Sequence, residues 1–104
     1  MHVFDRVHFD AMTAGDRALQ IEVLGLFRDT VSSVRAAFSD DARWRDAVHT
    51  LKGSARGIGL SELAEACEQA EAGGEADRAA ALARVEARLD EALAAVEQFI
   101  AAAP

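Results

Sequence analysis

The chain is poor in the residues that interrupt helices and in those that build sheets. Its 104 residues include no tyrosine, and the only proline is the last residue, Pro104. Long runs of β-branched residues are missing, whereas 24 residues are alanine, the best helix former. This composition argues against a β-sheet and predicts helices over most of the length.

Positive charge, cysteine and long apolar segments are also scarce. Lys and Arg number 11 against 18 Asp and Glu, a net charge of −7, so we expect no nucleic-acid partner. The single cysteine, Cys67, cannot form an internal disulfide, which predicts a reducing, cytoplasmic location. No uncharged apolar run reaches the roughly 18 residues of a membrane span, and the N-terminus does not resemble a signal peptide. We therefore expect no contact with a membrane.

Glycine, serine and aspartate positions divide the chain into segments. The expected helices cover residues 16–38, 41–58, 61–72 and 75–100. Ser61 is expected to cap the third of them. Short connections between the later helices favour antiparallel neighbours. The sequence predicts one domain over residues 1–104, an all-α antiparallel four-helix bundle with a short N-terminal helix or arm packed on it.

Each expected helix carries apolar residues at spacings of three and four, which places them on one face. The predicted buried residues are Leu24, Phe27, Val31, Val34, Phe38, Trp44, Val48, Leu51, Ala55, Ile58, Leu63, Cys67, Ala70, Leu82, Val85, Leu89, Val96 and Ile100. Val23 and Leu26 are expected to widen the buried face of the first long helix. An apolar edge of the N-terminal segment is expected from Val3, Phe4, Val7, Phe9 and Met12.

Most potential chemical groups fit an ordinary structural interpretation. His2 and His8 are six residues apart with no cysteine nearby, a weak signal for a metal site. Cys67 lies at a core position and is interpreted as a small buried apolar side chain. The chain contains neither a phosphate-binding GxxxxGK[ST] loop nor a serine-centred elbow. We expect no metal or cofactor in this chain.

His49 differs from the other histidines in its helical position. At about 100° per residue, the apolar residues of the helix over 41–58 lie on the side opposite His49. The residues that share its face are Arg45, Lys52, Gly53 and Arg56. Cations beside an exposed imidazole favour a phosphoryl group. No cluster of carboxylates is expected to face His49, and only Asp46 lies at the margin of this face.

After His49, three glycines lie within a span of seven residues, namely Gly53, Gly57 and Gly59. A glycine inside a helix costs about 0.8–1.0 kcal/mol relative to alanine, so in an alanine-rich chain these positions need a reason. Gly59 can simply end the helix. Gly53, one turn after His49, leaves a strip of bare backbone that allows a bulky partner to approach.

Residues 49–60, HTLKGSARGIGL, closely resemble the signature of histidine-containing phosphotransfer (HPt) domains. That signature is a histidine, then Leu-Lys-Gly-Ser, then a glycine ten residues after the histidine. The resemblance implies a small helical bundle with His49 phosphorylated, Lys52 near the phosphoryl oxygens, and Gly53 and Gly59 giving the partner access and shaping the helix end. Arg45 and Arg56 are assigned to the phosphoryl group from the helical geometry alone.

The resemblance implies a phosphorelay intermediate in two-component signalling. A neutral imidazole would take the phosphoryl group from a receiver-domain aspartate, and the group would later pass to another receiver. The Mg²⁺ for this transfer is expected on the receiver. The expected partners are response-regulator receiver domains and a hybrid or other sensor histidine kinase, and we expect a monomer. No nucleotide-binding segment fits in the chain, so we expect no kinase activity of its own.

Three other interpretations remain open or are disfavoured by the residues. The dimerisation helix of a sensor kinase typically has Glu after the histidine and a proline shortly beyond, a pattern from which Thr50 departs. A helical adaptor that is never phosphorylated remains possible, as does an HPt module phosphorylated directly by a kinase module. Met1 and the ending at residues 101–104 favour a free-standing protein.

Overall fold

A computed structural model describes residues 2–102, so Met1 and residues 103–104 lie outside the described part. Its elements are α1 (Arg6–Thr13), α2 (Arg17–Arg35), α3 (Trp44–Ile58), α4 (Ser61–Ala72), a 3-10 turn η1 (Glu75–Asp77) and α5 (Arg78–Ala101). No strand occurs among the described residues. The all-helical fold that the composition predicts is therefore confirmed.

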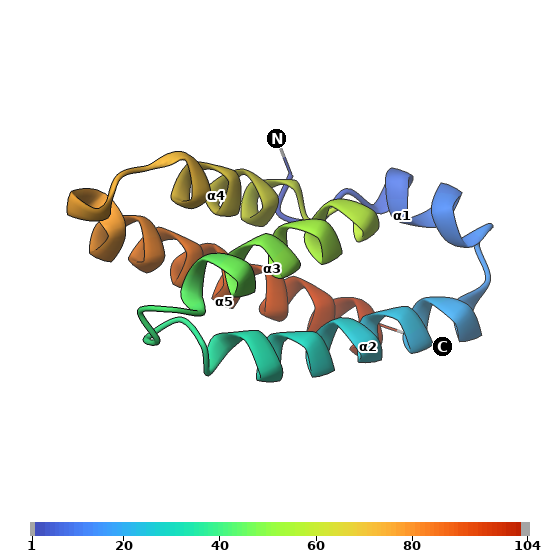
Figure 1. Ribbon diagram of the computed structural model, residues 1–104. Helices are drawn as coiled ribbons and strands as arrows, with labels where there is room; N and C mark the ends of the chain where they lie inside the picture. The colour runs from blue at the N-terminus through green and yellow to red at the C-terminus, as the bar shows by residue number, and fades with distance from the viewer. Residues whose placement is uncertain (1, 103–104) are drawn as a thin grey trace.

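Helices α2 to α5 form an elongated antiparallel bundle, and α1 packs at one end of it (Figure 1). The molecule measures 46 × 25 × 18 Å. In the bundle α3 lies between α2 and α4, and α5 packs against both α4 and α2. Each helix thus has two neighbours around a shared core. Within the described residues, no helix is both long enough and apolar enough to cross a membrane.

The core consists largely of the apolar residues predicted from their spacing. Leu24, Val48, Leu51, Cys67 and Leu89 are completely inaccessible to solvent. Two predicted core residues, Leu82 and Ile100, are only partly buried. The expectation that Leu26 widens the buried face of α2 is wrong, because its side chain is 60% exposed. Leu26 lies at the edge of the α2 stripe, and no other helix covers it.

Local hydrogen bonds move several helix ends from their expected positions. Asp16 caps α2 by accepting a hydrogen bond from the backbone N–H of Leu19. The carboxylate of Asp40 accepts from the N–H groups of Ala42 and Arg43, which holds this segment as a turn and delays α3 until Trp44. The predicted cap at Ser61 is wrong, because Ser61 is already the first residue of α4 and makes no capping bond.

The N-terminal segment is fastened to the end of α3 and the start of α4. The N–H of Asp5 donates to the carbonyl of Gly59 at 2.7 Å, and the N–H of Glu62 donates to the carbonyl of His2 at 2.9 Å. Phe9 is fully buried in an aromatic cluster with Phe4 and Phe99. The expected apolar edge is only partly correct, because Val7 and Met12 are exposed. This segment therefore closes the bundle next to the glycine-rich end of α3.

Candidate functional site

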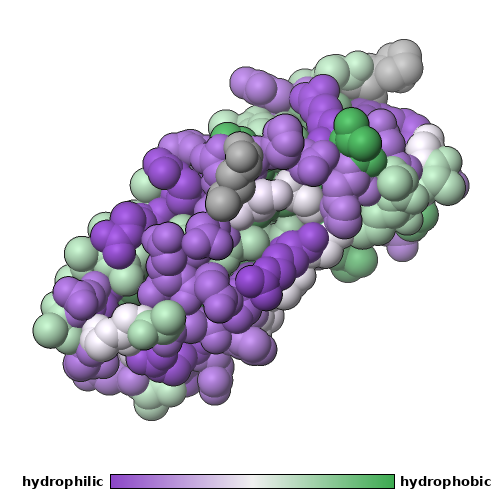
Figure 2. All heavy atoms as spheres, turned by 90° about the horizontal axis from the view of Figure 1, so that it is seen from above, coloured by the Kyte–Doolittle hydropathy of each residue, from purple (hydrophilic) through white to green (hydrophobic). Residues whose placement is uncertain are grey.

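His49 projects from α3 into solvent, as its helical position predicts. Its side chain is 68% exposed, whereas the adjacent Val48 is completely buried. The face of the molecule turned upward in Figure 1 is mostly hydrophilic, with hydrophobic side chains only scattered over it (Figure 2). The imidazole is therefore accessible to another molecule without rearrangement of the core.

Glu71 of α4 contacts the imidazole directly. The Nδ1 atom of His49 lies 3.0 Å from Oε2 of Glu71. Burial opposes ionisation of Glu71, but hydrogen bonds from Lys52 and His49 outweigh it and hold the pKa of this carboxyl below its ordinary value. An ionised carboxylate can only accept, so Nδ1 carries the proton and donates it. The lone pair then resides on Nε2, which makes no hydrogen bond to any of residues 2–102.

Lys52 lies between the two helices and binds two carboxylates. Its Nζ atom is 2.9 Å from Oε2 of Glu68 and 2.7 Å from Oε1 of Glu71, and only 13% of the side chain is exposed. Oε1 of Glu71 is buried, and the ammonium group of Lys52 supplies its compensating charge. Hydrogen bonds to Glu68 and Glu71 raise the pKa of Lys52. Because Glu71 contacts both Lys52 and His49, the ammonium and the imidazole are close neighbours.

The two arginines assigned to this face have different positions. The Nη2 atom of Arg56 lies 3.3 Å from Oε2 of Glu68, so Arg56 belongs to the same ionic cluster as Lys52. Arg45 instead donates from Nη1 to the backbone carbonyl of Glu71, and its guanidinium stacks on the ring of Trp44. Arg45 thus holds the end of α4, and this geometry does not support its assignment to a phosphoryl group.

The expectation that no carboxylates face His49 is wrong. Glu68 and Glu71 reach this face from α4, a helix that the angular argument on α3 alone could not include. Their spacing of three places them on one side of α4, next to the buried Cys67. That pattern was visible in the sequence, but it identifies partners of Lys52 only once α4 is known to pack antiparallel beside α3. Burial raises the pKa of the Cys67 thiol to about 12, consistent with an inert core residue.

The glycines near His49 serve two different purposes. A Cβ atom at Gly53 would meet nothing within 4 Å, so the predicted bare strip is present. Gly59 ends α3 with a φ of 88°, and a Cβ there would lie 2.8 Å from the carbonyl oxygen of Asp5. Gly59 therefore shapes the helix end as expected, but it is buried and cannot give a partner access, so that part of its assignment is wrong.

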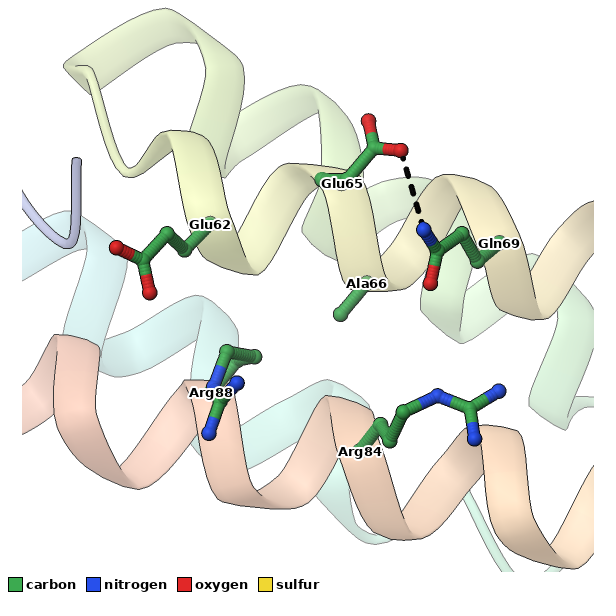
Figure 3. A pocket seen from close by; sticks show the side chains of 6 residues that line it. All are labelled: Glu62, Glu65, Ala66, Gln69, Arg84 and Arg88. Atoms are coloured by element: carbon green, nitrogen blue, oxygen red, sulfur yellow. Dashed lines mark hydrogen bonds between the residues drawn. The ribbon is translucent and has the colours of Figure 1, made fainter. Parts of the chain in front are cut away.

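One hollow of the surface lies away from this site, between α4 and α5. Its volume is about 210 Å³, and it is lined by Glu62, Glu65, Ala66, Gln69, Arg84 and Arg88 (Figure 3). These α4 residues lie on a different side of the helix from Glu68 and Glu71. Among residues 2–102, no three His, Cys, Asp or Glu side chains come together in a way that could hold a metal ion.

Comparisons with known proteins agree with this geometry. Residues 18–99 match the model of a family described as Hpt domain. The chain is similar in structure to the histidine phosphotransferase ShpA from Caulobacter crescentus, with a TM-score of 0.84 and 37% sequence identity. That similarity covers 95% of this chain and 91% of ShpA. A search of curated proteins finds no match.

Proposed function

The chain belongs to the Hpt domain family, and from this membership we propose that it carries a phosphoryl group on His49 between two receiver domains. The group would arrive from the phosphorylated aspartate of one receiver and leave to the aspartate of another. Receiver domains and a sensor histidine kinase, hybrid or separate, are the partners in this proposal. The chain would act as a monomeric carrier in the cytoplasm.

The hydrogen bond between His49 and Glu71 is the observation that carries the proposal. With the proton held on Nδ1, the lone pair of Nε2 is free to attack phosphorus. The N–P bond forms, the P–O bond to the aspartate breaks, and the aspartate leaves as a carboxylate with the electron pair. The ring gains positive charge, which the carboxylate of Glu71 stabilises in the way an aspartate stabilises the imidazolium of a hydrolase triad.

Lys52 and Arg56 would supply positive charge to a phosphoryl group on His49. Phosphoryl transfer passes through a loose transition state, which depends on positioning and charge stabilisation rather than on covalent help from the protein. Lys52 is positioned for this role by its two carboxylate partners and by its spacing of three residues from His49. The Mg²⁺ that shields the phosphoryl oxygens would come with the receiver.

The apolar surface next to His49 offers a docking area for a receiver. A groove between α2 and α3 is lined by Val23, Leu26, Phe27, Thr30, Ser54 and Ile58. Ser54 of this groove directly follows Gly53 in the chain. Leu26 and Val23 would provide most of the affinity, and the basic groups near His49 would contribute mainly to the association rate.

Phosphate uptake at a single residue tests the proposal. We expect wild-type protein incubated with a phosphorylated receiver to gain one acid-labile phosphate, located at His49 by mass spectrometry. His49→Gln should gain none, with an unchanged melting temperature because the side chain is exposed. His8→Gln is the matched control, since His8 is also exposed and contacts the carbonyl of Gly57 in α3. Unphosphorylated wild type would favour the adaptor interpretation, and uptake by His49→Gln would place the acceptor elsewhere.

A further inference from the structure

Glu68 is the one carboxylate of the site that contacts the cations but not the imidazole. Its Oε2 atom lies 2.9 Å from Nζ of Lys52 and 3.3 Å from Nη2 of Arg56. Glu71, in contrast, also accepts the hydrogen bond from His49. The function proposed above gives Glu71 a part in orienting the ring, whereas Glu68 enters it only as a partner that positions Lys52.

The hydrogen-bonding capacity of Lys52 makes the position of Glu68 significant. An ammonium group has three N–H donors, of which Glu68 and Glu71 engage two in the resting protein. A phosphoryl group on His49 would place roughly two negative charges near this ammonium. It would compete with Glu68 for the same cations and would also be repelled by its carboxylate. Glu71 would remain engaged, because the phosphorylated ring still needs its Nδ1 proton accepted.

We propose that Glu68 is an internal competitor of the phosphoryl group, a conclusion that rests on the function proposed above. In the resting protein its carboxylate occupies Lys52 and Arg56, and it gives up these cations when His49 is phosphorylated. The competition makes the phosphorylated state less stable than Lys52 and Arg56 alone would make it. Glu68 is thus a positioning residue that favours onward transfer over storage of the group.

The surroundings of Glu68 suit such an exchange. Its side chain is 47% exposed, so it can turn into solvent when the cations are taken over, whereas Glu71 is 21% exposed and held by both Lys52 and His49. Bonding to Lys52 holds the pKa of Glu68 below its ordinary value, so Glu68 stays ionised at neutral pH. The charged groups of the cluster are Lys52 and Arg56 from α3 and Glu68 and Glu71 from α4.

The ionisation of the phosphoryl group on His49 provides a direct readout. Phosphoramidate is a suitable probe because it needs no partner protein: its P–N bond breaks, a P–N bond to Nε2 forms, and ammonia leaves. The second ionisation of the attached group is then followed by ³¹P NMR as a function of pH. In Glu68→Gln we expect the acid dissociation constant for this second ionisation of the phosphoryl group to rise about two- to fivefold, in line with the strength of an exposed ion pair.

Glu65→Gln is the matched control, since it makes the same charge change one turn earlier on α4, where Glu65 accepts only from Gln69. It should leave the dissociation constant unchanged. Equal constants in the wild type and Glu68→Gln, or equal shifts in both variants, would overturn the inference and leave the proposed function intact. No phosphohistidine signal from the wild type would overturn the proposed function and this inference with it. A melting temperature close to wild type checks that Glu68→Gln remains folded.

Discussion

Charged side chains join neighbouring helices in two regions of this bundle, with different consequences. Between α2 and α5, Arg28 pairs with Glu97, and Arg35 pairs with Glu86 and Asp90. All five of these side chains are at least 35% exposed, so water competes with every pair. These pairs join the helices without surrounding any reactive group.

The ionic cluster between α3 and α4 uses the same kinds of side chain in another arrangement. Lys52 and Glu71 are largely withdrawn from solvent, while His49 beside them is open to it. The partly buried charges therefore fix the proton on one imidazole nitrogen and leave the other nitrogen accessible. The two regions contain similar ion pairs, but only the pairs between α3 and α4 contact a reactive side chain. The functional effect of an ion pair in this protein therefore depends on the groups beside it.

Removing a cation from each region should give the largest contrast. We expect Lys52→Ala to slow phosphoryl transfer by about 10- to 100-fold, at or below the effect of losing one donor to a developing charge in an enzyme site. Its melting temperature should fall, because Oε1 of Glu71 loses its compensating charge. Arg35→Ala should leave transfer unchanged and lower the free energy of unfolding by about 1 kcal/mol or less. Rapid-quench transfer assays and thermal melts measure both effects, and equal transfer rates in the two variants would contradict the distinction.

Two glycines in helix interiors allow a second comparison between the site on α3 and the surface of α2. A Cβ atom at Gly53 in α3 or at Gly25 in α2 would meet nothing within 4 Å. Each Gly→Ala change should therefore raise the free energy of unfolding by about 0.5–1 kcal/mol. Gly53→Gln should slow transfer much more than Gly53→Ala, because the longer side chain fills the strip beside His49.

Gly25→Gln, outside the site, should transfer at the wild-type rate. Chemical denaturation and the transfer assay together check these expectations. A wild-type rate in Gly53→Gln would show that the bare strip is not needed for partner access.

The pH dependence of stability should give the smallest difference. The pKa of Glu71 is lowered in the folded protein, so its contribution to stability is present at neutral pH and is lost as the pH falls through the folded-state pKa. The difference in unfolding free energy between wild type and Glu71→Gln should therefore shrink on acidification. Glu97→Gln, which alters an exposed pair, should differ little from wild type at any pH. Urea titrations at several pH values would contradict this if both variants behaved alike.

Much of the fold and one side of the site could be predicted from the sequence. The spacing of Val48 and Leu51 identified the buried side of α3, and the same periodicity placed His49 on the exposed side. The glycine pattern indicated both the open strip at Gly53 and the helix end at Gly59. These features are local, because a helix converts sequence spacing directly into angular position.

The wrong predictions about the surroundings of His49, Leu26 and Gly59 concern contacts between separate segments of the chain. The angular positions on α3 were correct, but they carried no information about Glu68 and Glu71, which reach the site from α4. In the same way, Leu26 is apolar and correctly spaced, but no neighbouring helix covers it. The assignment of Gly59 to partner access was wrong for the same kind of reason. Its burial depends on the position of Asp5 in the N-terminal segment, which the sequence of α3 does not reveal.

The sequence by itself determined which segments are helical, which face of each is buried and which histidine is exposed, because these depend on spacing within one helix. Only the tertiary structure decided the electrostatics around His49. The packing of α4 beside α3 brings Glu71 to the imidazole and engages Lys52 with two carboxylates. Ion-pair and hydrogen-bond strength depends on separations of a few ångströms and on exclusion of water, and neither is specified until two helices pack together.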